Sequence, residues 1–65
     1  MERLRRTVSE ALEKQLSCQI PDDEIRRIWP NDSDRHYQLA RFANENQWLL
    51  LSYTQDEGAI FYRRN

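Results

Sequence analysis

The sequence has very few of the residues from which most active sites are built. Its 65 residues include one glycine (Gly58), one cysteine (Cys18) and one histidine (His36). A single glycine cannot form a glycine-rich phosphate loop, and one histidine with one cysteine falls short of the ligand sets of zinc or haem sites. One cysteine also excludes a disulfide bond within the chain. We therefore expect neither a metal nor a cofactor.

Long apolar runs are also missing. No stretch approaches the roughly 20 apolar residues that span a bilayer, and the N-terminal sequence MERLRRTVSEALEK lacks the continuous apolar segment of a signal peptide. A chain with one cysteine also fits a reducing compartment. We therefore expect a cytoplasmic protein with no membrane-bound part.

An excess of charge of either sign is absent as well. Ten basic and eleven acidic residues give a net charge of −1, whereas a DNA-binding domain is usually basic. The chain is too short to enclose a typical substrate pocket, and none of its serines has a nearby base in sequence that would mark a nucleophile. We expect neither enzymatic activity nor a small-molecule substrate.

The sequence does contain the pattern of three helices, over about residues 3–18, 22–29 and 33–46. The second begins at Pro21, which acidic residues follow, and ends before Pro30. In the first helix, residues three and four apart form an apolar stripe of Leu4, Val8, Ala11, Leu12 and Leu16. The predicted inward side of the third helix holds His36, Leu39, Ala40 and Ala43, with Phe42 at its edge.

The segment WLLLSYTQDEGAIFY, residues 48–62, predicts a β-hairpin over about residues 48–63. TQDEG is its turn, and Gly58 suits a left-handed backbone there. Its register stays open, because loops of different length pair different partners, and a slip of one residue exchanges the inward and outward side chains. The large apolar residues of its two faces are Trp48, Leu49, Leu50, Leu51, Ile60, Phe61 and Tyr62. One face can pack on the helices, and the other must meet solvent, a second copy, a protein partner or a nucleic acid.

Three helices followed by a C-terminal two-stranded antiparallel hairpin make an α+β fold, which we expect to form a single domain over residues 1–65. This order of elements resembles a winged helix-turn-helix domain, and LARFANENQWLLLSYTQDEGAIFYRR looks like the end of a recognition helix running into a wing. The resemblance is one of pattern and length, without a diagnostic motif. The family's short first strand would fall on CQI, residues 18–20.

The resemblance implies a DNA-reading role for the third helix and the hairpin. It would place Arg35, Gln38 and Arg41 near bases or phosphates, and Arg63 and Arg64 on the backbone beside the wing. Arginine and glutamine are suitable readers of base edges. The charge pattern argues against this role, because two acidic residues share the helix face with Gln38 and Arg41 and would be repelled by phosphate.

The surplus of aromatic and aliphatic side chains on the hairpin favours a protein partner instead, since aromatic residues and arginine dominate interface energetics. We expect a non-enzymatic interaction or regulatory adaptor module that binds a partner protein, or a second copy, through the hairpin. The residues expected to make this contact are Tyr37, Arg41, Trp48, Leu50, Phe61, Tyr62 and Arg63. A DNA-binding transcriptional regulator is the alternative.

Overall fold

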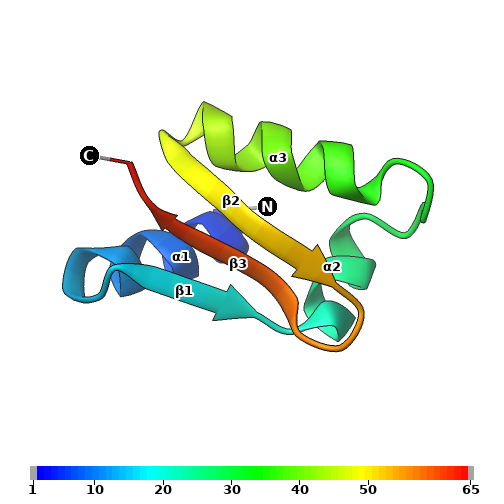
Figure 1. The fold of residues 1–65 in the computed structure, drawn as a ribbon, viewed down its shortest axis with the longest axis horizontal. Coiled ribbons are helices and arrows are strands. Elements are labelled where there is room, and N and C mark those ends of the chain that lie inside the picture. The colour runs from blue at the N-terminus through cyan, green and yellow to red at the C-terminus, as the bar shows by residue number, and fades with distance from the viewer. Residues whose placement is uncertain (1, 65) are drawn as a thin grey trace.

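The computed structural model describes residues 2–64 as three helices and a three-stranded antiparallel sheet (Figure 1), which confirms the predicted α+β class. The helices lie close to their expected positions, and the C-terminal hairpin is present. The elements in chain order are α1 (Glu2–Lys14), β1 (Ser17–Ile20), α2 (Asp22–Ile28), α3 (Arg35–Glu45), β2 (Trp48–Thr54) and β3 (Gly58–Arg63).

The hairpin is part of a larger sheet than the two-stranded ribbon that the sequence predicts. The strand order is β1-β3-β2, so β3 pairs with a neighbour on each side. β1 runs antiparallel to β3, with Ser17 opposite Tyr62 and Ile20 opposite Ala59. The pairing continues one residue further, because the Arg63 amide donates to the Leu16 carbonyl at 3.1 Å. Four residues between two helices carry a weak local signal, and their strand conformation comes from this long-range pairing.

The first helix buries most of the predicted apolar stripe. Leu4, Val8 and Leu12 are buried in the core. Leu16, expected to continue the stripe, is 74% exposed. The reason is that α1 ends at Lys14 and the chain then turns into β1, so Leu16 is no longer in register with the helical face. At 13 residues α1 is the longest helix, and none within residues 2–64 has the length and apolarity that a bilayer span requires.

The buried face of α3 differs from the prediction. Leu39 and Ala43 are buried as expected, but His36 and Ala40 are exposed. Arg35 takes the inward place at the start of the helix, and the buried face consists of Arg35, Leu39, Phe42 and Ala43. The projection of this helix already places Arg35 towards its apolar side, but an arginine is not counted among the apolar residues, so the predicted face is turned by about one position.

Aromatic rings form the centre of the core, between the helices and the sheet. The Phe42 ring lies 5.6 Å from the rings of both Trp29 and Trp48 and 5.8 Å from the ring of Phe61, each in an edge-to-face arrangement. This geometry is preferred because it places the positive ring edge against the negative ring face. One phenylalanine of α3 thus joins the end of α2 to both strands of the hairpin.

Two residues with positive φ define where the hairpin begins and where it turns. Gly58 has φ 76°, and a Cβ atom there would collide with the Ile20 carbonyl oxygen and lie 3.0 Å from the Asp22 amide nitrogen. The missing side chain therefore allows the hairpin turn to lie against the junction of β1 and α2. Gln47 has φ 64° and directly follows the Asn46 cap of α3. A non-glycine residue is strained in this conformation, which is the usual place of a C-terminal glycine.

Adding a side chain at Gly58 and removing the side chain at Gln47 should change the free energy of unfolding in opposite directions. Gly58→Ala should lower the free energy of unfolding by about 2 kcal/mol or more, because it adds a backbone collision to the left-handed strain. Gln47→Gly should raise it by up to about 1 kcal/mol, because it relieves strain without removing a buried contact. Chemical denaturation monitored by circular dichroism measures both. A tolerated Gly58→Ala variant would contradict the described turn.

Candidate functional site

The sheet has one face packed on the helices and one face without them. Ala59 and Phe61 of β3 are buried in the core, so the alternation of side chains points Ile60 and Tyr62 to the opposite side. Leu49 of β2 is opposite Tyr62 and lies on the same side. Figure 1 shows this side of the sheet, with the first turns of α1 passing behind β2 and β3. We call the surface formed by Leu49, Ile60 and Tyr62 the outer face.

Small polar residues border the outer face on both flanking strands. Ser17 and Gln19 of β1 are exposed beside Tyr62 and Ile60, and Ser52 of β2 is half-buried opposite Ile60. None of the three carries a charge. Leu49, Ile60 and Tyr62 are all half-buried, so an apolar centre with a neutral polar rim remains in contact with solvent. An apolar centre surrounded by a polar rim is typical of protein-binding surfaces.

The edge strand β2 contains a β-bulge. The pairing with β3 shifts between Leu50 and Ser52, which leaves Leu51 as the additional residue, 61% exposed. A bulge disrupts the hydrogen-bond ladder and is one of the devices by which proteins prevent another strand from pairing with a sheet edge. Docking on the outer face therefore fits this sheet better than strand addition at β2.

The hairpin residues expected to bind a partner do not share one surface. Phe61 is 0% exposed, and Trp48 and Leu50 are partly buried and pack against the core cluster. The expectation for Phe61 was wrong because the register could not be read from the sequence, whereas a binding role of Trp48 and Leu50 stays a prediction. Tyr62 alone among the expected hairpin aromatics lies on the outer face. Phe61→Asp would place a carboxylate in the centre of the core, so it is unsuitable as an interface variant.

The expected contacts on α3 are not brought together with Tyr62. Tyr37, 64% exposed, and Arg41 lie on the side of α3 opposite its buried face, and the Arg41 guanidinium donates to Glu45 at 3.1 Å. Arg63 is exposed at the open end of the hairpin, but it alternates with Phe61 and borders a hollow with Glu13 of α1 on the helical side of the sheet. The structure thus separates the expected partner-binding residues into two surfaces and a core.

Arg35 was expected near DNA, but it is only 4% exposed. Its Nε donates to the Trp29 carbonyl at 2.8 Å and its Nη2 to the Pro30 carbonyl at 3.0 Å. Its Nη1 lies 2.6 Å from an Asp32 carboxylate oxygen. These contacts satisfy the carbonyl groups at the end of α2 and hold the turn between α2 and α3. Arg35 is therefore a structural residue, and no free side of its guanidinium is left for a phosphate.

Tyr53 of β2 connects this turn to the start of α2. Its hydroxyl accepts a hydrogen bond from Arg35 at 3.4 Å and donates to the Asp22 carboxylate at 2.5 Å. The hydrogen bond from Tyr53 is the largest cause that lowers the pKa of Asp22, and the neighbouring Arg26 adds to it. Burial, followed by the bond to Asp22, raises the pKa of Tyr53. A polar network thus joins β2 to both ends of α2, and hydrophobicity patterns cannot predict it.

The remaining residues expected near DNA lie among acidic groups. On α3, Gln38 is half-buried, Arg41 is paired with Glu45, and Asp34 precedes the helix. Asp56 and Glu57 are exposed at the turn of the hairpin, where the resemblance places the tip of the wing. The exposed Arg63 and Arg64 lie at the other end of the hairpin, where Arg63 is paired with Trp48 and Arg64 follows it. A DNA backbone along α3 and the turn would therefore meet mainly negative charge.

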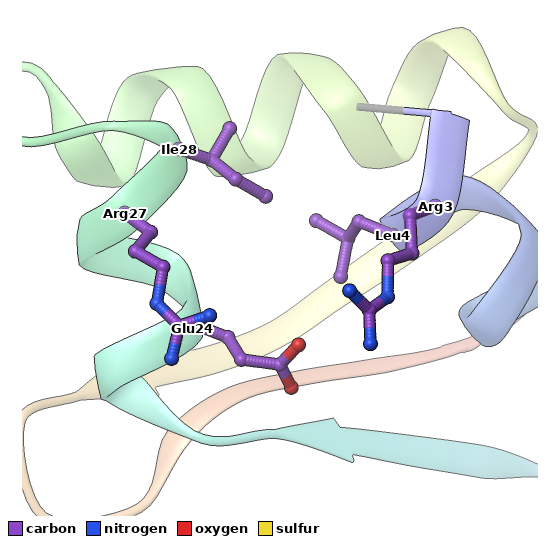
Figure 2. A pocket seen from close by; sticks show the side chains of 5 residues that line it. All are labelled: Arg3, Leu4, Glu24, Arg27 and Ile28. Carbon is purple, nitrogen blue, oxygen red and sulfur yellow. The ribbon is translucent and has the colours of Figure 1, made fainter.

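A hollow of about 210 Å³ lies between α1 and α2 (Figure 2). Leu4 and Ile28 point toward each other across it, and the Glu24 carboxylate extends from α2 between the side chains of Arg3 and Arg27. The carboxylate offsets one of the two positive charges and so weakens the attraction of the hollow for an anion. This hollow is therefore a weak candidate for a ligand site.

Metal-binding side chains are not clustered in the part of the chain that the structure describes, and its cysteine is half-buried. Within residues 2–64, no three histidine, cysteine, aspartate or glutamate side chains are placed to hold a metal ion. Cys18 packs against the core, and burial raises the pKa of its thiol, which disfavours the reactive thiolate. The outer face remains the strongest candidate site.

The polar network predicts a pH-dependent effect of Tyr53→Phe, which removes the donor to Asp22. A carboxylate whose pKa is lowered by folding stabilises the fold above its ordinary pKa of about 3.9, and this contribution is lost as the pH falls through the lowered value. Tyr53→Phe should therefore raise the pKa of Asp22 and reduce stability at neutral pH, with a smaller difference in strong acid. Denaturation curves across pH and an NMR titration of the Asp22 carboxyl measure this. The exposed Tyr37→Phe is the control, and an equal stability difference at every pH would contradict the network.

No protein-family model, no curated protein and no solved structure matches the chain. Its function has to be inferred from the outer face and from the charges that surround it.

Proposed function

We propose that this chain is a small, non-enzymatic protein-interaction module of the cytoplasm, which acts as an adaptor or regulatory protein. The outer face binds its partner. One observation carries the proposal: Leu49, Ile60 and Tyr62 form an apolar patch on the side of the sheet opposite the buried Ala59 and Phe61.

Several features of the outer face support a protein as its ligand. Its centre is aromatic and aliphatic, its rim is polar and uncharged, and the adjacent Leu51 is 61% exposed. Contiguous apolar patches on small proteins usually mark interaction sites, and tyrosine is enriched among the residues that dominate binding. The bordering serine and glutamine side chains can exchange hydrogen bonds with a partner without the cost of burying a charge.

The alternative, a DNA-binding regulator with a winged-helix-like arrangement, receives less support from the charges. It would use the solvent side of α3 and the hairpin turn. The acidic residues Asp34, Asp56 and Glu57 belong to that surface, and its main exposed base, Arg41, is paired with Glu45. Phosphate contacts supply most of the affinity of DNA-binding proteins. We therefore prefer a protein partner.

Site-specific photo-crosslinking tests the proposal in the cells from which the sequence derives. A benzophenone amino acid replaces Tyr62 on the outer face or, as the matched control, the exposed Tyr37 on α3. We expect a discrete crosslinked protein band from position 62 and none from position 37, because only the former lies in the proposed interface. Crosslinking from position 37 alone, or from neither position, would contradict this function.

A further inference from the structure

We propose that the occupant of the outer face is a second copy of this chain. The two copies would be related by a two-fold axis that sets their β3 strands antiparallel to each other, face to face. This inference rests on the proposed function, because it identifies the partner of the same surface. It follows from the way in which charge is distributed along the hairpin.

The two ends of the hairpin carry opposite charges. Asp56 and Glu57 are exposed in the turn, and Arg63 and Arg64 are exposed at the open end. Within residues 2–64, none of these four side chains takes part in an ion pair. Arg63 alternates with Phe61 and borders a hollow with Glu13 of α1 on the side of the helices, so Arg64 is the base that lies toward the outer face. The outer face therefore lies between an acidic turn and a basic end whose nearest base is Arg64.

In a two-fold dimer with antiparallel β3 strands, the acidic end of each copy meets the basic end of the other copy, so the favourable contact occurs twice. The turn of each copy then lies over the open end of the other, so both ends are neutralised by one isologous contact. The other two-fold arrangement, with parallel strands, would bring turn against turn and arginine against arginine. Like charges across an interface disfavour an orientation, so electrostatics selects the antiparallel one.

The position of the apolar residues fits the same axis. If the axis passes between the two outer faces at the level of Phe61, Ile60 of one copy lies over Tyr62 of the second copy, and the reverse contact is identical. Arg64, three residues after Phe61, then lies over Gly58 of the second copy, three residues before its Phe61. Arg64 is thereby next to Glu57 of the second copy. The apolar contact is then at the centre and the charged contacts are at both ends, as in other protein interfaces.

The size of the outer face predicts a weak dimer. Six residues at about 3.3 Å each and three strands at about 4.8 Å cover roughly 300 Å² per copy. Stable complexes bury about 800 Å² per partner, so association should depend on concentration in the micromolar to millimolar range. In so small an interface, the charges at its ends decide orientation and contribute a large share of the affinity.

Sedimentation equilibrium of the whole chain at low salt, over concentrations from about 10 μM to about 1 mM, tests the proposal. We expect a monomer–dimer equilibrium that added salt weakens. Ile60→Lys should weaken it by at least about ten-fold, because it puts a charge into the apolar centre. Tyr37→Lys adds the same charge on α3 and should leave it unchanged. A dimer that tolerates Ile60→Lys would overturn the use of this face.

Charge-reversed variants test the antiparallel orientation. One variant combines Asp56→Arg with Glu57→Arg, and the other combines Arg63→Glu with Arg64→Glu; all four positions are exposed, so both should stay folded by circular dichroism. Each variant alone should associate at least about ten-fold more weakly than the natural chain. An equimolar mixture should form a heterodimer, because every charged contact is then between opposite signs. If either variant alone dimerises as tightly as the natural chain, the antiparallel orientation is wrong, because only antiparallel strands gain like-charge contacts from the reversal. If the mixture stays monomeric while the natural chain dimerises, the charged ends do not contact each other at all.

The result also separates this inference from the proposed function. A natural chain that stays monomeric at the highest concentration overturns the second copy as partner. If position 62 still crosslinks to a different protein in cells, the outer face remains an interaction surface with another occupant. If position 62 crosslinks to nothing and the chain is monomeric, both proposals fail.

Discussion

The pairing of β3 along both of its edges is the constraint on which the rest of the structure depends. Because β1 and β2 hold β3 from two sides, its side chains cannot exchange faces by a slip of register. Ala59 and Phe61 are thereby fixed in the core, and Ile60 and Tyr62 are fixed on the outer face. The glycine at position 58 makes this possible, since the turn lies against the backbone between β1 and α2. The pairing of the strands, and not the hydrophobicity of the residues, therefore decides which side chains are available for binding.

A second constraint acts at the opposite side of the core, where Arg35 holds the turn between α2 and α3. Its guanidinium satisfies two backbone carbonyls that would otherwise lack a partner at the end of α2, and it contacts Tyr53 of the sheet. A buried arginine is tolerated when its donors are occupied, as they are here. The aromatic cluster around Phe42 lies beside this network. Together they fix α3 against β2.

The sequence predicts the parts of this fold that depend on local signals. The apolar stripe of α1, the proline-bounded α2 and the glycine-containing turn all follow from spacing or backbone preference. Three features depend on contacts distant in sequence. The strand β1 lies where the resemblance implies a short strand, although its four residues carry little local signal; the bulge at Leu51 sets the hairpin register; and the burial of Arg35, which lies towards the apolar side of its helix, is completed by polar contacts that no local pattern shows. The assignment of Phe61 to the binding surface failed for the second of these reasons. Alternation along β3 would have found Ile60, had the register been known.

The outer face is an apolar surface that the chain, within residues 2–64, does not cover with another element. NMR relaxation enhancement by an inert paramagnetic cosolute, measured on a dilute sample, tests that claim directly. We expect the side-chain signals of Ile60 and Tyr62 to relax faster, as those of the exposed Tyr37 do, while those of Ala59 and Phe61 remain shielded. If Ile60 and Tyr62 are shielded like Phe61 in the dilute sample, the chain covers its own outer face and the account is wrong.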